Sequence, residues 1–382
     1  MTFEFPPKHF EEKSPLQPSL AAVRVFKSDF DAALSAFDGL AIEHTVAFSQ
    51  ARWPKVALEP WLFEAAGQVK AGVLVLVQRL PLGLGHLAIV KWGPVLADKT
   101  GEDASAIYKS ILTFLKAHYA IDRDMMLTVM ANAESSADSK IFGWMLSNGF
   151  EADYALPFPA RYHINVKLSD AEQRKSFAQK WRYHLNKAEK ANLVFEEADV
   201  AQLPRFQKLY DAMSDRKNFP DYSAYHTLPH LMKTLPDALK PKLFFITHQG
   251  EDVAGAVVFA SGRTAAYLYG ATNNQALPLR AGYLLHARII SWLRDNTKAE
   301  WYDLGGTDGF QGLQQFKKGM VGTAGRILDL PPQAHFAATL RAGFAGHGAY
   351  WLRNLLLRAR VTLDMLRGRF AKADQVRNDS SD

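Results

Sequence analysis

The sequence predicts an α/β protein built from two copies of one mixed-sheet unit, followed by an amphipathic C-terminal helix. An alternating β pattern fills residues 61–98, with Val73, Val75 and Val77 on one face and a hairpin turn at 83–85. The order of strands and helices that follows is repeated in the second half, which indicates a duplicated unit. A mixed sheet with helices on its faces favours ligand binding at the carboxyl ends of its strands.

In the first half, a strand and a short helix are expected over residues 21–37, after a Pro-rich segment at 1–20. Helical patterns at 102–118 and 138–147 enclose a strand at 125–130. The second half has helices at 173–192 and 200–213, then strands at 242–248, 253–260 and 263–269. A helix at 283–296 and a strand at 301–304 complete the repeat. We therefore expect domains at 1–165 and 166–330 and a basic tail at 331–382.

The composition, with 48% hydrophobic and 22% charged residues, is that of a globular protein. The absence of cysteine excludes disulfides, thiolate metal sites and a cysteine nucleophile, and it fits a reducing cytoplasm. No signal peptide is expected at the N-terminus. The sequence contains no run of about eighteen apolar residues, so no membrane-spanning helix is expected either. Residues 335–373 carry seven Lys/Arg and one acid, so the whole net charge of +6 arises there.

Residues 301–320 combine a short strand, the turn Gly305-Gly306 and a helical piece that contains Lys317-Lys318. A tight turn beside a solvated lysine pair explains this pattern as well as an active centre does. Asp303 either orients a reacting group or caps the glycine turn. His226 and His230 have a metal-like spacing, but Pro229 separates them and no third ligand is apparent, so no metal is expected.

Several scattered motifs together resemble the FemABX peptidyltransferases, tRNA-dependent aminoacyl ligases built from two tandem GNAT-like acyltransferase domains. The motifs are Phe48-Ser49-Gln50 with Trp53 and Lys55, Gly93-Pro94-Val95, Leu209-Tyr210 with Arg216, the segments at 267–273 and 280–292, and WYDLGG at 301–306 with Phe316-Lys317. The resemblance covers residues 43–322. It implies two GNAT-like domains, each a mixed twisted sheet flanked by helices, before the C-terminal helix.

The resemblance implies that an amino acid passes from aminoacyl-tRNA to an amine of a peptidoglycan precursor, which is either nucleotide-linked or lipid-linked. Phe316-Lys317 would lie at the active centre, and Lys55 and Arg216 near the phosphates of the precursor. Either Tyr267 or Tyr269 would line the same channel. Such a transfer stabilises a tetrahedral oxyanion, which suits a lysine ammonium and needs no enzyme nucleophile. We assign that role to Lys317 and expect a cytoplasmic protein without a resident cofactor.

The competing function is that of an acyl-CoA-dependent N-acyltransferase. Coenzyme A is disfavoured because residues 280–285, RAGYLL, carry one glycine where pyrophosphate loops need several. A non-catalytic module that binds the membrane surface is a third alternative.

Two basic helices are candidates for partner binding. In the helix at 173–192, Lys180, Lys187 and Lys190 share one side and Arg182 lies apart; this face either contacts tRNA phosphates or is simply solvated. In the tail, residues 350–370 form an arginine-flanked apolar stripe that either touches an anionic membrane or packs on the protein itself. The stripe consists of Leu352, Leu355, Leu356, Ala359, Leu363, Leu366 and Phe370.

Overall fold

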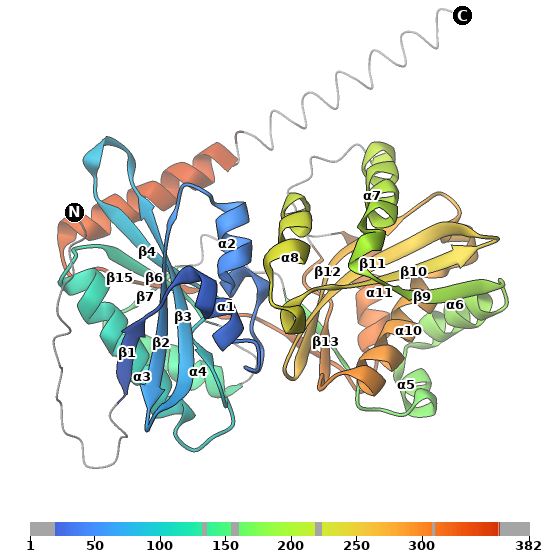
Figure 1. Cartoon of the computed structure of the whole chain (residues 1–382), viewed down its shortest axis with the longest axis horizontal. Helices are drawn as coiled ribbons and strands as arrows, with labels where there is room; N and C mark the ends of the chain where they lie inside the picture. Colours follow the sequence, from blue (N-terminus) through green and yellow to red (C-terminus); the bar gives the residue numbers. More distant parts are fainter. Residues whose placement is uncertain are drawn as a thin grey trace, which may run out of the picture.

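The computed structural model describes residues 20–131, 136–153, 160–217, 224–307, 310–357 and 359. Two mixed sheets, each with helices on its faces, form two domains that lie side by side (Figure 1). The predicted α/β class and the predicted duplication are therefore confirmed. Within the described ranges, no helix is long and apolar enough to cross a membrane.

The first sheet has the strand order β1-β2-β3-β4-β6-β15-β7, with β5 paired to β3. Its neighbours are antiparallel except for the parallel pair β4 and β6. Its strands are β1 (Ala21–Arg24), β2 (Ala57–Ala65), β3 (Gln68–Arg79), β4 (His86–Lys91), β5 (Val95–Leu96), β6 (Met126–Met130), β7 (Glu151–Asp153) and β15 (Gln333–Phe336).

The second sheet repeats this plan in the order β9-β10-β11-β12-β13-β8-β14, again with one parallel pair, β12 and β13. Its strands are β8 (Arg161–Asn165), β9 (Leu193–Ala198), β10 (Lys242–His248), β11 (Glu251–Ser261), β12 (Thr264–Thr272), β13 (Trp301–Asp303) and β14 (Arg326–Leu328).

The two domains exchange one strand each. Strand β8, which follows the first domain in sequence, lies between β13 and β14 of the second sheet. Strand β15, which follows the second domain, lies between β6 and β7 of the first sheet. The second sheet thus begins a few residues before the expected boundary at 165. The segment from 331 onward is not only a tail, because its strand completes the first sheet.

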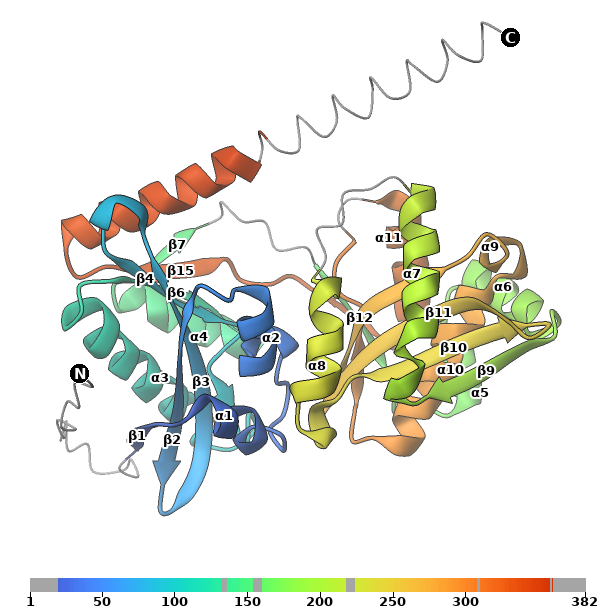
Figure 2. The ribbon, with the colours of Figure 1, turned by 45° about the horizontal axis from the view of Figure 1, so that its top comes forward.

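Helices cover both faces of each sheet (Figures 1 and 2). On the first sheet, α3 (Ala104–Leu115), a π-helical turn (Lys116–Ile121) and α4 (Ser136–Ser147) lie on one face, and α1 (Lys27–Ala33) and α2 (Val46–Arg52) on the other. On the second sheet, one face carries α5 (Asp170–Ser176), α6 (Gln179–Glu189), α9 (Ala276–Leu279), α10 (Ala281–Asn296) and α11 (Gln311–Val321). The other carries α7 (Leu203–Lys217) and α8 (Leu228–Thr234). Short 3-10 turns lie at Ile42–His44, Pro81–Gly83, Val200–Gln202, Tyr225–Thr227 and Asp237–Leu239.

A shared core joins the domains. Leu231 of α8 and Leu235, which follows the helix, belong to the same buried cluster as the side chains of α1 and α2. The Ser261 hydroxyl donates to the carbonyl of Phe37 at 3.0 Å, and the Arg263 amide donates to Asp38 Oδ1 at 3.1 Å. Because apolar packing and polar contacts both cross the boundary, the two sheets hold a defined relative position.

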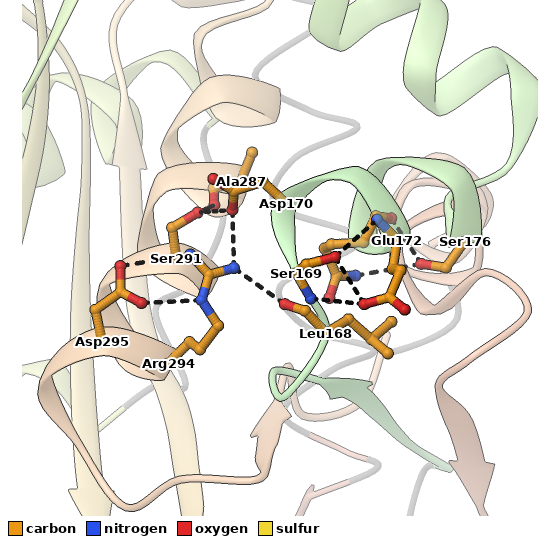
Figure 3. Close-up of polar contacts among 10 residues, drawn as sticks. Leu168, Ser169, Asp170, Glu172, Ser176, Ala287, Ser291, Arg294 and Asp295 are labelled. Atoms are coloured by element: carbon orange, nitrogen blue, oxygen red, sulfur yellow. Dashed lines mark hydrogen bonds and ion pairs between the residues drawn. The ribbon is translucent and has the colours of Figure 1, made fainter.

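The basic helix expected at 173–192 is two helices, which corrects that prediction. Phe177 and Ala178 adopt extended backbone between α5 and α6, because Phe177 turns into the core and the Ala178 amide donates to Gly319 O of α11 at 2.9 Å. A capping box between Ser169 and Glu172 starts α5, and Arg294 of α10 pairs with Asp170 at 2.8 Å (Figure 3). These contacts fasten α5 to α10, which places α6 and α11 side by side.

A C-terminal helix spans 340–357 and lies along the first domain (Figure 2). It packs through Ala342, Gly346 and Tyr350, whereas Leu352, Leu355 and Leu356 of the predicted stripe are exposed. These three leucines are 43%, 48% and 60% exposed, so the described part of the predicted stripe is open to solvent. Leu363, Leu366 and Phe370 lie outside the described residues.

Candidate functional site

The parallel strands of the two sheets differ at their carboxyl ends. In the first sheet, β4 and β6 stay paired from Leu87 to Lys91, and the Gly93 amide still donates to Met130 O at 3.2 Å. In the second sheet, β12 pairs with β13 only through Ala266, although β12 continues to Thr272. The β13 chain continues along β8 instead, since the Leu304 amide donates to Tyr162 O at 2.9 Å in the same register. The second sheet therefore splays where a ligand is favoured.

A β-bulge separates the two candidate tyrosines of β12. Val257 pairs with Tyr269 and Val258 with Tyr267, so Leu268 is the extra residue and the strand changes phase there. Tyr267 consequently faces α10, with its ring 4.9 Å from that of His286, whereas Tyr269 faces Tyr225 on the opposite side of the sheet. Of the two tyrosines that the sequence left open, the structure thus brings Tyr267 to the splayed end.

Gly270 makes room for this tyrosine. A Cβ atom at Gly270 would lie 1.5 Å from the Tyr267 hydroxyl oxygen. The phenol therefore lies directly over the glycine backbone. Burial raises the pKa of Tyr267 well above its ordinary value, so its hydroxyl stays protonated at neutral pH.

The glycine turn after β13 is held by the Lys317 ammonium. Lys317 is only 5% exposed, and its Nζ donates to Leu304 O at 2.5 Å and to Gly306 O. Gly305 has a φ of +67°, a conformation that suits glycine. The neighbouring Lys318 is exposed. The predicted lysine pair therefore separates into one buried cation that fixes the turn and one solvated cation.

An aromatic cluster lies next to this lysine. Phe316 is half-buried and packs with Tyr283 at 5.0 Å and with His286 at 5.6 Å between ring centroids. Trp181 of α6 packs against both Phe316 and Tyr283. Burial first, and then the Lys317 charge, lowers the pKa of His286 to about 3, so this imidazole is neutral. The Lys317 ammonium is therefore next to a neutral aromatic cluster.

Asp303 is part of the support for the turn. Arg161 donates to both of its carboxylate oxygens, and the Gly305 amide donates to Oδ1 at 2.7 Å. Burial alone would raise the pKa of Asp303, but the hydrogen bond from His163 and the charge of Arg161 outweigh it and hold the pKa well below its usual range. An ionised carboxylate engaged in this way caps the turn, the structural alternative that the sequence left open.

The two other cations singled out in the sequence lie elsewhere. Lys55 is exposed in the turn that joins α2 to β2. Arg216 falls in the last turn of α7, and its side chain lies outside the described residues. Neither is brought to Lys317 by a described contact.

The sequence reasoning missed Lys91. Its Nζ lies 4.9 Å from the centroid of the Trp53 ring, two residues from Lys55, at the paired end of β4 and β6. Burial is the main cause that lowers the pKa of Lys91. The charge of Glu43 raises this pKa, and the charges of Arg353 and Arg52 lower it. The only sequence signal was the Lys-Trp-Gly-Pro turn, which also fits a purely structural role.

On α6, the exposed cations lie as expected. Lys180, Lys187 and Lys190 are solvent-facing, while Trp181 and Leu185 are buried. Arg182 differs, because its guanidinium donates to the carbonyls of Lys175 and Phe177 across the break between α5 and α6. In the described ranges, no three His, Asp or Glu side chains are grouped so that they could hold a metal ion.

The chain is similar to known acyltransferases in sequence pattern. The FemAB family model matches residues 62–239, and the model described as an acetyltransferase (GNAT) domain matches residues 172–318. No curated protein sequence matches the chain.

Solved structures share the fold at low sequence identity. The crystal structure of FemX is 15% identical, with a TM-score of 0.68 over 87% of this chain and 100% of that one. The C-terminal domain of a putative lysylphosphatidylglycerol synthetase from Agrobacterium fabrum is 13% identical, with a TM-score of 0.52 over 85% and 96%. L-PGS from Bacillus licheniformis is 12% identical, with a TM-score of 0.51 over 86% and 96%. The tandem GNAT-like fold and the resemblance expected from the sequence are thereby confirmed.

Proposed function

We propose that this chain, an acyltransferase of the FemAB and GNAT type, transfers an aminoacyl group from aminoacyl-tRNA to an amine of a peptidoglycan precursor. The observation that carries the proposal is the splayed end of β12 and β13, where a buried ammonium fixes a glycine turn beside Tyr267. In the reaction, the amine nitrogen attacks the ester carbonyl carbon. A C–N bond forms, the ester C–O bond breaks, and the proton of the amine passes to the ribose oxygen that leaves.

Lys317 supplies electrostatic stabilisation of the oxyanion in this proposal. Its ammonium is already oriented by Leu304 O and Gly306 O, so little reorganisation is needed when negative charge develops. Phe316 and Tyr283 keep the surroundings apolar, which strengthens the field of the charge. Tyr267 contributes a protonated hydroxyl at the same strand end. A nucleophilic enzyme residue is not required, since the donor is an activated ester.

The substrates are proposed to bind through separate cationic surfaces. Lys180, Lys187 and Lys190 on the exposed face of α6 suit the phosphate backbone of tRNA. Lys55 and Lys91 beside Trp53 suit the phosphates of the precursor, and Arg216 remains an expectation from the family resemblance. A cytoplasmic location, where charged tRNA is available, accords with this function, and a lipid-linked precursor would place the reaction at the inner face of the plasma membrane.

The competing donor is an acyl-CoA, which the GNAT match over residues 172–318 favours. Against it, α10 begins at Ala281 with the bulky Tyr283 and Leu284 near its start, and Tyr283 is packed on Trp181. The phosphate-binding amides of a coenzyme A loop need glycine at such positions.

One experiment separates these donors. Purified protein is incubated with charged tRNA or with acetyl-CoA, each with a nucleotide-linked or a lipid-linked precursor, and the mass of the precursor is followed. We expect the precursor to gain an aminoacyl residue only from charged tRNA, and ribonuclease treatment of the donor to abolish the gain. Transfer from acetyl-CoA alone would overturn the proposal, and the acceptor that gains mass identifies its carrier.

A further inference from the structure

The C-terminal helix at 340–357 is firmly attached by one face. Ala342, Gly346 and Tyr350 recur every four residues and are buried against the first domain. The Tyr350 hydroxyl donates to Thr128 Oγ1 at 3.0 Å, and Arg341 pairs with Asp124. The helix therefore has a defined orientation on the domain.

The opposite face of this helix is apolar and exposed. Leu340, Phe344, Trp351 and Leu355 are 81%, 77%, 66% and 48% exposed. Their spacings of four, seven and four residues place them in one line along the helix. We call these four residues the outer stripe. Leu352 and Leu356 are also exposed. The outer stripe begins at Leu340, twelve residues before Leu352, where the stripe predicted from the sequence begins.

The tip of the β3–β4 hairpin extends this apolar surface. Leu82 is 95% exposed and Leu84 is 50% exposed. Leu80 and Leu87, on either side of the tip, pack in the same cluster as Tyr350, and a Cβ on Gly85 would lie 3.7 Å from Arg341 Nη1. Both views show the hairpin and the helix at the same edge of the first domain (Figures 1 and 2).

The net charge of the helix is positive, which favours an anionic partner. Residues 340–357 contain Arg341 and Arg353, both exposed, and no Asp or Glu. The sequence continues with four more arginines and one acid through residue 370. An exposed apolar stripe on a helix with a net positive charge matches the interface of an anionic bilayer, where the apolar side chains enter the headgroup boundary and the positive charge attracts anionic lipid. A tryptophan such as Trp351 is favoured at that depth.

We propose that the outer stripe, together with Leu82 at the hairpin tip, seats the first domain on the surface of an anionic lipid bilayer. The helix lies in the plane of the interface and does not cross it. Arg353 sits about 60° from Tyr350 on an ideal helix and therefore faces back toward the domain, where its charge reaches Lys91. The proposal requires neither Lys317 nor any donor substrate.

The test is flotation of the full-length protein with vesicles of phosphatidylcholine alone or with about a third phosphatidylglycerol. The parent protein should float with the anionic vesicles and bind the neutral ones at least tenfold more weakly. A variant with Leu340→Gln, Phe344→Gln, Trp351→Gln and Leu355→Gln should lose at least tenfold of the anionic binding. The matched control carries Val194→Gln and Leu277→Gln, which are 61% and 66% exposed in the second domain, and should bind as the parent does.

Sedimentation velocity without lipid tests the other occupant of the stripe, a second copy of this chain. A dimer that the stripe variant dissociates, with vesicle binding unchanged, would overturn the proposal. Equal vesicle binding by parent and stripe variant would overturn it as well. Circular dichroism and activity on a water-soluble acceptor show that the stripe variant is folded. Because the vesicles carry no precursor, failure of aminoacyl transfer leaves the outcome of this test unaffected.

Discussion

The two domains have the same strand plan but end their parallel strand pair differently. In the first domain, β4 and β6 remain paired to Lys91 and Met130. In the second domain, β12 and β13 part after Ala266, and the gap in the pairing holds a glycine turn fixed by Lys317. Residues common to both units explain the scaffold. The splay, the bulge at Leu268 and the buried lysine are departures from it, and they coincide at one place.

The proposed acyl transfer therefore rests on the second domain, where these departures coincide. The first domain keeps a closed sheet, and its own features are Lys91 over Trp53 and the outer stripe of the C-terminal helix. The strand exchange through β8 and β15 and the shared core at α8 join the two domains. Substitutions in each domain test this difference.

Lys317→Ala should have the largest effect. Loss of one preoriented oxyanion donor lowers the turnover rate on the order of a hundredfold to a thousandfold. The variant should also lose about 1–3 kcal/mol of unfolding free energy, because the carbonyls of Leu304 and Gly306 lose their buried donor. Lys318→Ala, one residue along and exposed, is the control and should retain parent activity. Equal turnover of the two variants would contradict the assignment. Steady-state kinetics and urea unfolding measure both effects.

Gly270→Ala should reduce activity on the order of tenfold to a hundredfold, because the new Cβ displaces the Tyr267 ring from the splayed end. The ring can rotate away, so unfolding free energy should change by no more than about 1 kcal/mol. Gly282→Ala in α10 meets no atom within 4 Å and should stabilise the helix by about 1 kcal/mol with unchanged turnover. An active Gly270→Ala enzyme with parent kinetics would show that Tyr267 is only a core residue.

Each domain contains a buried neutral histidine that should destabilise the protein in acid, His44 in the first and His286 in the second. Burial lowers the pKa of His44 to about 4 and that of His286 to about 3. His44 Nε2 accepts from the Leu74 amide, so its Nδ1–H donates to Lys91 O. A second proton, on Nε2, would face the N–H of Leu74. Below the unfolded pKa of about 6.5, only the unfolded chain takes up these protons, so stability falls as pH falls.

The expected slope is about 1.4 kcal/mol per pH unit for each histidine between pH 6.5 and the folded pKa. Urea unfolding at pH 7 and pH 5 measures it. His286→Phe removes one titrating group among aromatic neighbours and should reduce the slope by that amount, while the slope between pH 7 and 8 should match the parent. An unchanged acid slope in His286→Phe would refute the contribution of the second domain.

The α6 face should show the smallest effect. Replacing Lys180, Lys187 and Lys190 with alanine should reduce the slope of log binding constant for tRNA against log salt by about 0.7–0.9 for each phosphate that the variant no longer neutralises. A control triple of Lys27, Lys167 and Lys208, exposed elsewhere, should leave the slope unchanged. Filter binding across a salt series distinguishes them. Equal slopes would mean that the α6 face is only solvated.

The local features of the fold could be predicted from the amino-acid sequence. Alternation predicted the central strand β3, and polar turns bounded the strands β10 and β11. Helical spacing predicted α3, α4 and α10, and the Gly305-Gly306 pair predicted the turn. The duplication could also be predicted, because the order of strands and helices in the first half of the sequence is repeated in the second half. These features depend on residues close together in sequence, which is why periodicity and turn chemistry suffice.

Features that depend on partners far away in the sequence could not be predicted and appear only in the folded structure. The short strands β8 and β15 acquire their place by pairing in the other domain's sheet. The bulge that separates Tyr267 from Tyr269 appears only when β12 is aligned with β11. Lys317 and Lys318 are alike in sequence, and the carbonyls after β13 decide which of them is buried. Likewise, the face of the C-terminal helix that remains exposed is set by what Tyr350 contacts on the first domain.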